Sequence, residues 1–139
     1  MANYDFNNLL SPIDFEHLVR DVLSEDLNIE LQEFSEGRDG GVDLRIAKSK
    51  NNKIVVQCKR TKELTKKTID EEFVKIEKLN PTKYYFVCSC TISSNLQNYI
   101  KDKFNKWMND DDRFIYSKSR LNSLLDKYKN VEKNNYKLW

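Results

Sequence analysis

Residues 37–60 read GRDGGVDLRIAKSKNNKIVVQCKR, and the alternation of residue types in this stretch predicts the centre of the fold. The first seven letters contain all three glycines of the chain, which is typical of a tight turn that needs positive φ. Val42–Ala47 follows as a strand, Lys48–Lys53 as a polar loop and Ile54–Lys59 as a second, more apolar strand. Two short strands joined by a polar loop predict an antiparallel hairpin.

The end of this hairpin gathers polar side chains of three kinds. Because side chains alternate along a strand, Gln57 and Lys59 share one face and Cys58 points to the other. Asp43 directly follows the glycine-rich turn at the start of the first strand. If the hairpin register sets Asp43 across from Gln57 or Lys59, then a carboxylate, an amide oxygen and an ammonium meet on one face.

This set of groups suits metal-assisted hydrolysis of a phosphodiester. A hard divalent cation such as Mg²⁺ prefers oxygen ligands, lowers the pKa of a bound water and neutralises charge on the phosphate. Lys59 can orient or deprotonate the water, or hold the phosphate as a point charge. Gln57 offers a neutral oxygen where a second carboxylate is usual. We expect Glu16, on an upstream helix, to supply the missing charge.

Helices and further strands flank the hairpin on both sides in the sequence. Upstream, Ser11-Pro12 opens a helix, and Asn28–Phe34 alternates like a strand. Downstream, the patterns predict, in chain order, a helix from the capping-box sequence Thr68–Glu71 to Asn80-Pro81, a buried strand Tyr84–Thr91, a helix from Ser93 to Met108, a strand Arg113–Ser117 and a helix through Tyr128. The order α-β-β-β-α-β-α-β-α predicts an α/β fold with a mixed central sheet flanked by helices.

The charge of the chain is unevenly distributed along the sequence. The formal net charge is +2, yet residues 1–43 carry −9 and residues 44–139 carry +11. Arg45–Lys67 holds nine basic side chains and a single acid, which favours contact with an anionic partner. The candidate nucleic-acid-binding residues are Arg38, Arg60, Lys62, Lys66 and Lys67.

Several classes of protein and site are disfavoured. A length of 139 residues suits one domain, and no apolar run approaches the roughly 18 residues of a membrane helix. The first residues lack the pattern of a secretory signal, and three cysteines do not form a disulfide framework, so we expect a cytoplasmic protein. His17 is the single histidine, which excludes a multi-histidine zinc site. Cys88 and Cys90 are expected to be buried strand cysteines.

Three motifs together resemble a known family. They are FEHLV at residues 15–19, GRDGGVD at residues 37–43 and VQCKR at residues 56–60. In this combination the chain resembles the Mrr-like branch of the PD-(D/E)XK restriction-endonuclease superfamily, in which Gln replaces the usual acid of the E-x-K element. One departure from the parent pattern is Val42 where proline usually precedes the aspartate.

The resemblance implies a restriction-endonuclease-like core over residues 1–139 and Mg²⁺ as cofactor, with Mn²⁺ as an expected substitute. It implies Glu16 and Asp43 as metal-binding carboxylates, Gln57 as a metal- or water-contacting residue and Lys59 as the catalytic lysine. The expected activity is endonucleolytic cleavage of DNA, in its double-stranded form.

The segments YYFVCSCTIS, SRLNSLL and KLW are similar to the N-terminal nuclease domain of bacterial antiphage STAND NTPases. This second resemblance implies a domain excised from a larger protein, with C-terminal NTPase and sensor domains as partners, and it leaves a homo-oligomer open. Two alternatives stand beside the nuclease: a catalytically silent nucleic-acid-binding module on the same fold, and a pure interaction domain.

Overall fold

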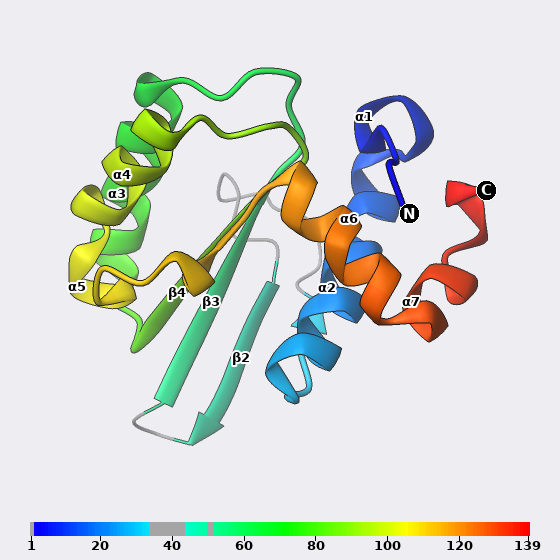
Figure 1. Ribbon diagram of the computed structural model, residues 1–139. Helices are drawn as coiled ribbons and strands as arrows, with labels where there is room; N and C mark the ends of the chain where they lie inside the picture. The colour runs from blue at the N-terminus through cyan, green and yellow to red at the C-terminus, as the bar shows by residue number, and fades with distance from the viewer. Residues whose placement is uncertain (1, 34–43, 50–51) are drawn as a thin grey trace.

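The structure, a computed structural model, describes residues 2–33, 44–49 and 52–139 and is built around a mixed β-sheet (Figure 1). Its strands, in spatial as well as chain order, are β1 (Gln32–Glu33), β2 (Leu44–Ser49), β3 (Asn52–Lys59), β4 (Lys83–Cys88) and β5 (Ile115–Tyr116). β1, β2 and β3 pair antiparallel, whereas β3, β4 and β5 pair parallel. The predicted mixed sheet with an antiparallel pair at its centre is confirmed.

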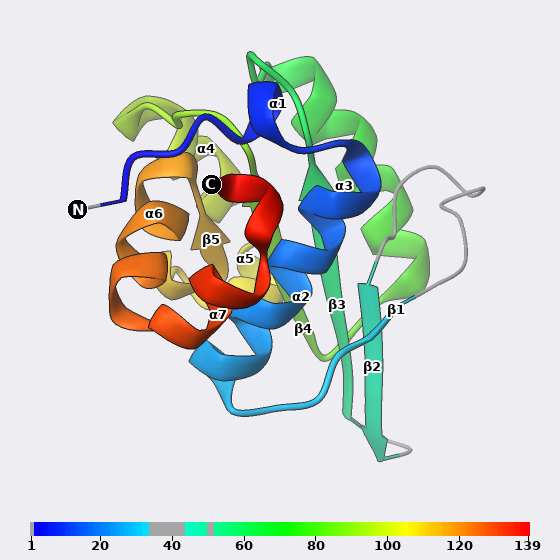
Figure 2. The same cartoon turned by 90° about the vertical axis from the view of Figure 1, so that its right-hand side faces the viewer.

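Helices cover both faces of the sheet. The α-helices are α1 (Phe6–Leu9), α2 (Pro12–Leu27), α3 (Lys66–Leu79), α4 (Ser94–Lys103), α5 (Asn105–Met108), α6 (Lys118–Lys127) and α7 (Lys129–Asn134), and the 3₁₀-helices are η1 (Asp112–Phe114) and η2 (Tyr136–Leu138). In Figures 1 and 2, α2, α6 and α7 lie on one side of the sheet and α3, α4 and α5 on the other. The predicted α/β class is therefore confirmed, with short additional helices. Within the described ranges, no helix combines the length and apolarity needed to cross a bilayer.

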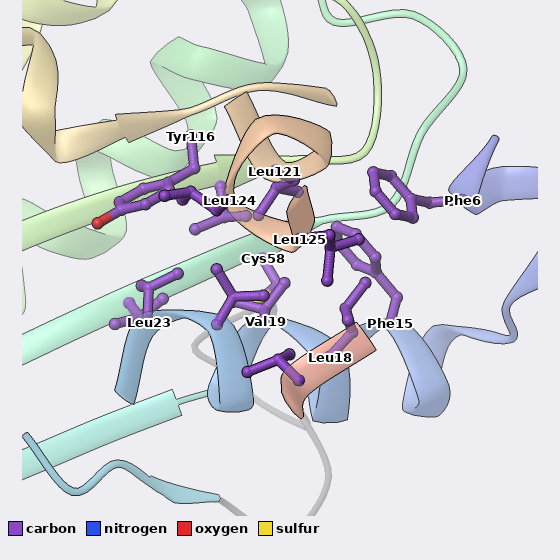
Figure 3. Close-up of a cluster of buried hydrophobic side chains, with 14 of the residues drawn as sticks. Phe6, Phe15, Leu18, Val19, Leu23, Cys58, Tyr116, Leu121, Leu124 and Leu125 are labelled. Carbon is purple, nitrogen blue, oxygen red and sulfur yellow. The ribbon is translucent and has the colours of Figure 1, made fainter. Parts of the chain in front are cut away.

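The core on the α2 side joins α1 and α2 to the last part of the chain (Figure 3). The predicted apolar stripe of α2, which runs from Phe15 to Leu23, is buried, and Ser11 caps the helix as expected. This stripe packs against Cys58 of β3 and against Leu121 and Leu125 of α6. Burial of these apolar side chains is the main term that holds α2 to the sheet.

The core on the α3 side is rich in aromatic residues. Ile69 and Ile76 of α3 pack against Val55 of β3 and against Tyr84 of β4. Phe104 and Trp107 complete this layer, and their rings lie against that of Phe73 with centroids 5.8 and 5.9 Å from it. Tyr84, Tyr85 and Trp107 are therefore core residues, as predicted, and Phe114 is partly buried between the two clusters.

Two predicted helix boundaries were wrong. α3 begins at Lys66 instead of Thr68, because Thr65 is the N-cap residue and its side chain accepts a hydrogen bond from the backbone N–H of Thr68. The predicted helix from Ser93 to Met108 is broken at Phe104, whose φ of −101° and ψ of 21° are not helical.

Asparagine in the left-handed conformation ends three of the described helices. Asn28, Asn80 and Asn109 follow α2, α3 and α5 with φ of 53°, 44° and 52°. Asparagine is the residue other than glycine that best tolerates this left-handed conformation. The glycines of the chain are concentrated elsewhere, so asparagine takes their usual place at helix ends.

Candidate active site

Gln57 and Lys59 lie on the face of the sheet that α3 covers. Val55, two residues before Gln57, belongs to the α3-side core, and the Lys59 Nζ lies 3.3 Å from the Glu72 Oε1 on α3. Because side chains alternate along β3, Gln57 between these two residues faces α3 as well. The structure thus brings together the two polar residues that the sequence places at the end of this strand.

The amide of Gln57 is buried without a hydrogen-bond partner among the described residues. The residue has 0% exposure, and neither its Oε1 nor its Nε2 is hydrogen-bonded. An unsatisfied buried polar group costs about 1–3 kcal/mol, so it is rarely retained without a role. None of the described residues binds this amide, which makes Gln57 a candidate ligand-binding residue.

Glu72 is a buried carboxylate that reaches the same place from α3. Its side chain is 1% exposed, and its Oε1 lies 2.8 Å from the Lys75 Nζ in addition to the contact with Lys59. Its Oε2 is buried and has no partner among the described residues. A buried carboxylate is tolerated only when it is paired, and the two ammonium groups meet that requirement through one oxygen alone.

Tyr84 extends this polar group along the sheet. It pairs with Val55 in the β3–β4 register, and its hydroxyl is buried without a partner in the part of the chain that the structure describes. Burial, and next the negative charge of Glu72, raise the pKa of Tyr84 well above its usual value. Glu72 therefore contacts Lys59 at one end of this face, and its charge acts on Tyr84 beside Val55 at the other end. Gln57 lies between Val55 and Lys59. The unsatisfied buried side-chain atoms of the described residues belong to Gln57, Glu72 and Tyr84.

Glu72 is not among the residues predicted from the sequence, although the sequence contains a signal for it. The residue lies three positions after Ile69 and four before Ile76, on the apolar stripe that α3 buries. An acid within such a stripe is expected to be buried, and a buried acid requires a partner. That partner, Lys59, is thirteen residues away in the sequence and could not be assigned from the helical pattern.

Asp43 and Arg38 lie outside the described residues, as does the whole GRDGGVD turn. The described register between β2 and β3 includes the pairs Leu44↔Val56 and Arg45↔Val55. This is the register on which the predicted pairing of Asp43 with Gln57 depends. The described pairs begin at Leu44, so the pairing of Asp43 with Gln57 stays a prediction.

Glu16 comes from the opposite side of the sheet. It lies on α2, is partly buried and follows Phe15, whose side chain packs in the α2-side core. The helix that carries Glu16 and the helix that carries Glu72 thus cover different faces. The described group around Gln57 is made by β3, β4 and α3.

The predicted nucleic-acid-binding residues differ in their surroundings. Lys62 is exposed between β3 and α3, and Lys66 and Lys67 are exposed in the first turn of α3. The Lys66 ammonium lies 5.0 Å from the centre of the Tyr99 ring. Arg60 has a structural task, because its Nε donates to the Leu10 carbonyl at 2.9 Å and its Nη2 to the Asn7 carbonyl at 2.9 Å.

The described residues contain no group of three or more His, Cys, Asp or Glu side chains that could hold a metal. Cys88 and Cys90 are buried, as predicted, with their sulfur atoms 2.8 Å apart. Gln57 and Glu72 together offer two buried oxygens that no described residue binds, beside a lysine, which suits part of a site for a hard cation.

Comparison with known proteins identifies the class of the chain. A family model of the Mrr catalytic type, described as "Restriction endonuclease", matches residues 8–114. The chain belongs to this restriction endonuclease family. The matched range includes Glu16, Asp43, Gln57 and Lys59 and also contains Glu72. The family membership agrees with the fold, and nucleases of this superfamily generally use divalent metals.

One curated relative of this restriction endonuclease domain is the "Uncharacterized protein y4cD" of Sinorhizobium fredii (strain NBRC 101917 / NGR234). It is 30% identical over 141 residues, which cover 98% of this chain and 21% of the relative. The chain therefore spans about a fifth of the length of that relative. No solved structure matches the chain significantly.

Proposed function

We propose that this chain is a Mg²⁺-dependent endonuclease domain that hydrolyses phosphodiester bonds in double-stranded DNA. The observation that carries the proposal is the buried amide of Gln57, which has no partner among the described residues and lies next to Lys59 on one face of β3. Membership of the restriction endonuclease family supports the same chemistry. Mn²⁺ is expected to replace Mg²⁺.

Each catalytic residue has a distinct role in this proposal. Asp43 and Gln57 supply oxygens to the cation, and Glu16 contributes a further carboxylate. When bound, Mg²⁺ supplies Lewis-acid stabilisation of the phosphate and activation of water. Lys59 orients the attacking water or holds the scissile phosphate, and Glu72 keeps its ammonium in position at 3.3 Å.

Basic residues near the site are proposed to hold the DNA backbone. Lys62, Lys66 and Lys67 are exposed on the segment that follows β3, and Arg38 and Arg60 are added from the sequence pattern. Contacts of lysine and arginine with phosphates are independent of base sequence and weaken with salt.

Plasmid cleavage tests the proposed function directly. We expect the parent chain to nick or linearise supercoiled plasmid in Mg²⁺ or Mn²⁺, and EDTA to abolish this activity. Asp43→Ala and Lys59→Ala should each lower the rate by at least about 100-fold, since each removes a group required for catalysis. A Lys78→Ala variant, which changes an exposed lysine late in α3, controls for loss of one positive charge. Equal cleavage by all variants would reject the assignment.

A catalytically silent DNA-binding module is the second candidate. It is favoured by Gln57, which provides one negative charge fewer than the usual acid of this element. Calorimetric titration with Mg²⁺ distinguishes the two functions. Salt-sensitive DNA binding without a metal site of millimolar affinity would favour the binding module.

We further propose that the domain acts within a longer protein of bacterial antiphage defence, joined to NTPase and sensor domains and working as a homo-oligomer in the cytoplasm. The resemblance to STAND-associated nucleases supports this setting. The chain covers 21% of the length of its relative, so that relative is a longer protein, which is compatible with this setting. Faster cleavage by the longer protein with its nucleotide than by the isolated chain would support the proposal, whereas equal rates of the two would oppose it.

A further inference from the structure

The proposed nuclease site has a deficit of negative charge because Gln57 is neutral. Metal sites that hydrolyse phosphodiesters are made mainly of carboxylate oxygens, since a hard divalent cation requires them. Glu72 supplies a buried carboxylate on the same face of β3, and neither the sequence motifs nor the family match gives it a role. We infer that Glu72 is a metal ligand that replaces the missing acid at position 57; this inference rests on the proposed function.

The two oxygens of Glu72 have different surroundings. Oε1 contacts the ammonium groups of Lys59 at 3.3 Å and of Lys75 at 2.8 Å. Oε2 has no partner among the described residues although it is buried. A purely structural ion pair of a buried carboxylate would be expected to satisfy both oxygens. This Oε2, which no described residue binds, is the atom that we assign to the cation.

The oxygen of Gln57 provides the second ligand from the described residues. Lys59, two residues further along the same strand face, is held by Glu72, and Tyr84 on the neighbouring strand pairs with Val55, two residues before Gln57. Gln57 lies between these positions, and its Oε1 also has no partner in the described part of the chain. A cation bound by both oxygens would satisfy two of the unpaired buried atoms at once.

The lysines around Glu72 do not exclude this role. Lys75 is 34% exposed on its side chain and Lys59 is 27% exposed, so both ammonium groups have access to solvent. Solvent screens their repulsion of a divalent cation more than it would in a closed interior. Each lysine can therefore neutralise the carboxylate without closing the site.

Metal affinity measured without DNA tests the inference. We would titrate Mn²⁺ into the 139-residue chain and follow the free ion by electron paramagnetic resonance. Glu72→Gln keeps the size of the side chain and removes its charge. We expect it to weaken Mn²⁺ binding by about tenfold or more, because even indirect partners of metal ligands have effects of 10–100-fold. Glu71→Gln, the exposed neighbour on α3, should remain within about twofold of the parent chain.

Two further variants test whether Glu72 is a metal ligand or only a structural residue, and whether Glu16 is the ligand in its place. Glu16→Gln tests the carboxylate of the opposite face, and a loss of affinity in Glu16→Gln with none in Glu72→Gln would overturn the inference. Glu72→Asp retains a carboxylate with a shorter reach, so partial recovery of Mn²⁺ affinity relative to Glu72→Gln supports a ligand. Circular dichroism of each variant confirms that the fold is intact. If Glu72→Gln does not fold, the comparison of Glu72→Asp with the parent chain decides, and an unchanged Mn²⁺ affinity would overturn the inference.

The outcomes distinguish this inference from the proposed function. Metal-dependent plasmid cleavage by the parent chain with equal Mn²⁺ affinity of Glu72→Gln would reject Glu72 as a ligand and leave the nuclease in place. A parent chain that neither binds Mn²⁺ nor cleaves DNA would remove the proposed function and, with it, the ligand role of Glu72.

Discussion

At the residue scale, Arg60 and Lys62 show how adjacent basic side chains take different roles. Arg60 uses its guanidinium to bind two backbone carbonyls of the N-terminal segment, those of Asn7 and Leu10. Lys62 is exposed and lines a cavity of about 320 Å³ beside Asp5 and Lys118. The sequence pattern groups the two residues as phosphate contacts, but the geometry of a planar guanidinium suits Arg60 to fasten the chain.

This difference predicts separable effects on stability and DNA binding. Arg60→Lys keeps the positive charge but loses the forked donors, and we expect it to lower the free energy of unfolding by about 1–2 kcal/mol in urea titration. Lys62→Gln should leave stability within about 0.5 kcal/mol and reduce the salt dependence of DNA affinity. Equal stability of both variants would contradict the role assigned to Arg60.

At the element scale, α3 links the sheet to the candidate site. Ile69 and Ile76 bury the helix against β3 and β4, and this packing sets the position of Glu72 over the sheet face. The helix is held at its start by the Thr65 cap and ends at Asn80 in the left-handed conformation. The geometry around Lys59 therefore depends on the correct register of α3.

The N-cap assignment of α3 is testable with a pair of threonines. Thr65→Ala removes the acceptor for the Thr68 N–H, so we expect it to lower the free energy of unfolding by about 1 kcal/mol. Thr68→Ala should have a smaller effect, below about 0.5 kcal/mol, because Thr68 lies within the helix and not at its cap. Urea titrations of both variants measure the difference. A larger loss of unfolding free energy in Thr68→Ala than in Thr65→Ala would support Thr68 as the N-cap residue, as the capping-box pattern predicts.

At the scale of the whole molecule, the two ends of the chain are joined. Asn122 of α6 accepts a hydrogen bond from the Tyr4 N–H at 2.7 Å and donates one to the Tyr4 carbonyl at 3.2 Å. The Ala2 N–H donates to Asp126 at 2.7 Å, and the Tyr4 hydroxyl donates to Glu132 at 2.6 Å. The Tyr4 hydroxyl also lowers the pKa of Glu132, which favours the charged form of the carboxyl. These contacts fasten the N-terminal residues to α6 and α7.

Asn122→Ala is expected to weaken this connection. The substitution leaves the Tyr4 backbone groups without their partner, so the free energy of unfolding should fall by about 1–3 kcal/mol. Amide hydrogen exchange of residues 2–10 should accelerate more than that of β3. Ser123→Ala, a change at the exposed neighbour, is the control and should have little effect. Unchanged exchange at the N-terminus would show that the contacts add no stability.

Much of the fold could be predicted because its patterns are local. The stripe of α2, the alternation along β3 and the apolar composition of β4 each lie within one element, and all three were found correctly. The order of elements followed from these patterns and was confirmed. The helix break at Phe104 was missed, since the apolar spacing continues across it and only the backbone conformation reveals it.

The amino-acid sequence by itself determined that Gln57 and Lys59 share a face, because the alternation of side chains is a property of a single strand. It also indicated the family, through motifs that a comparison then supported over residues 8–114. Only the tertiary structure decided that α2 and α3 cover opposite faces and that Glu72, not a residue of the motifs, lies 3.3 Å from Lys59. The physical reason is that contacts between elements arise when separate apolar surfaces pack together, and no local pattern records which polar groups that packing buries side by side.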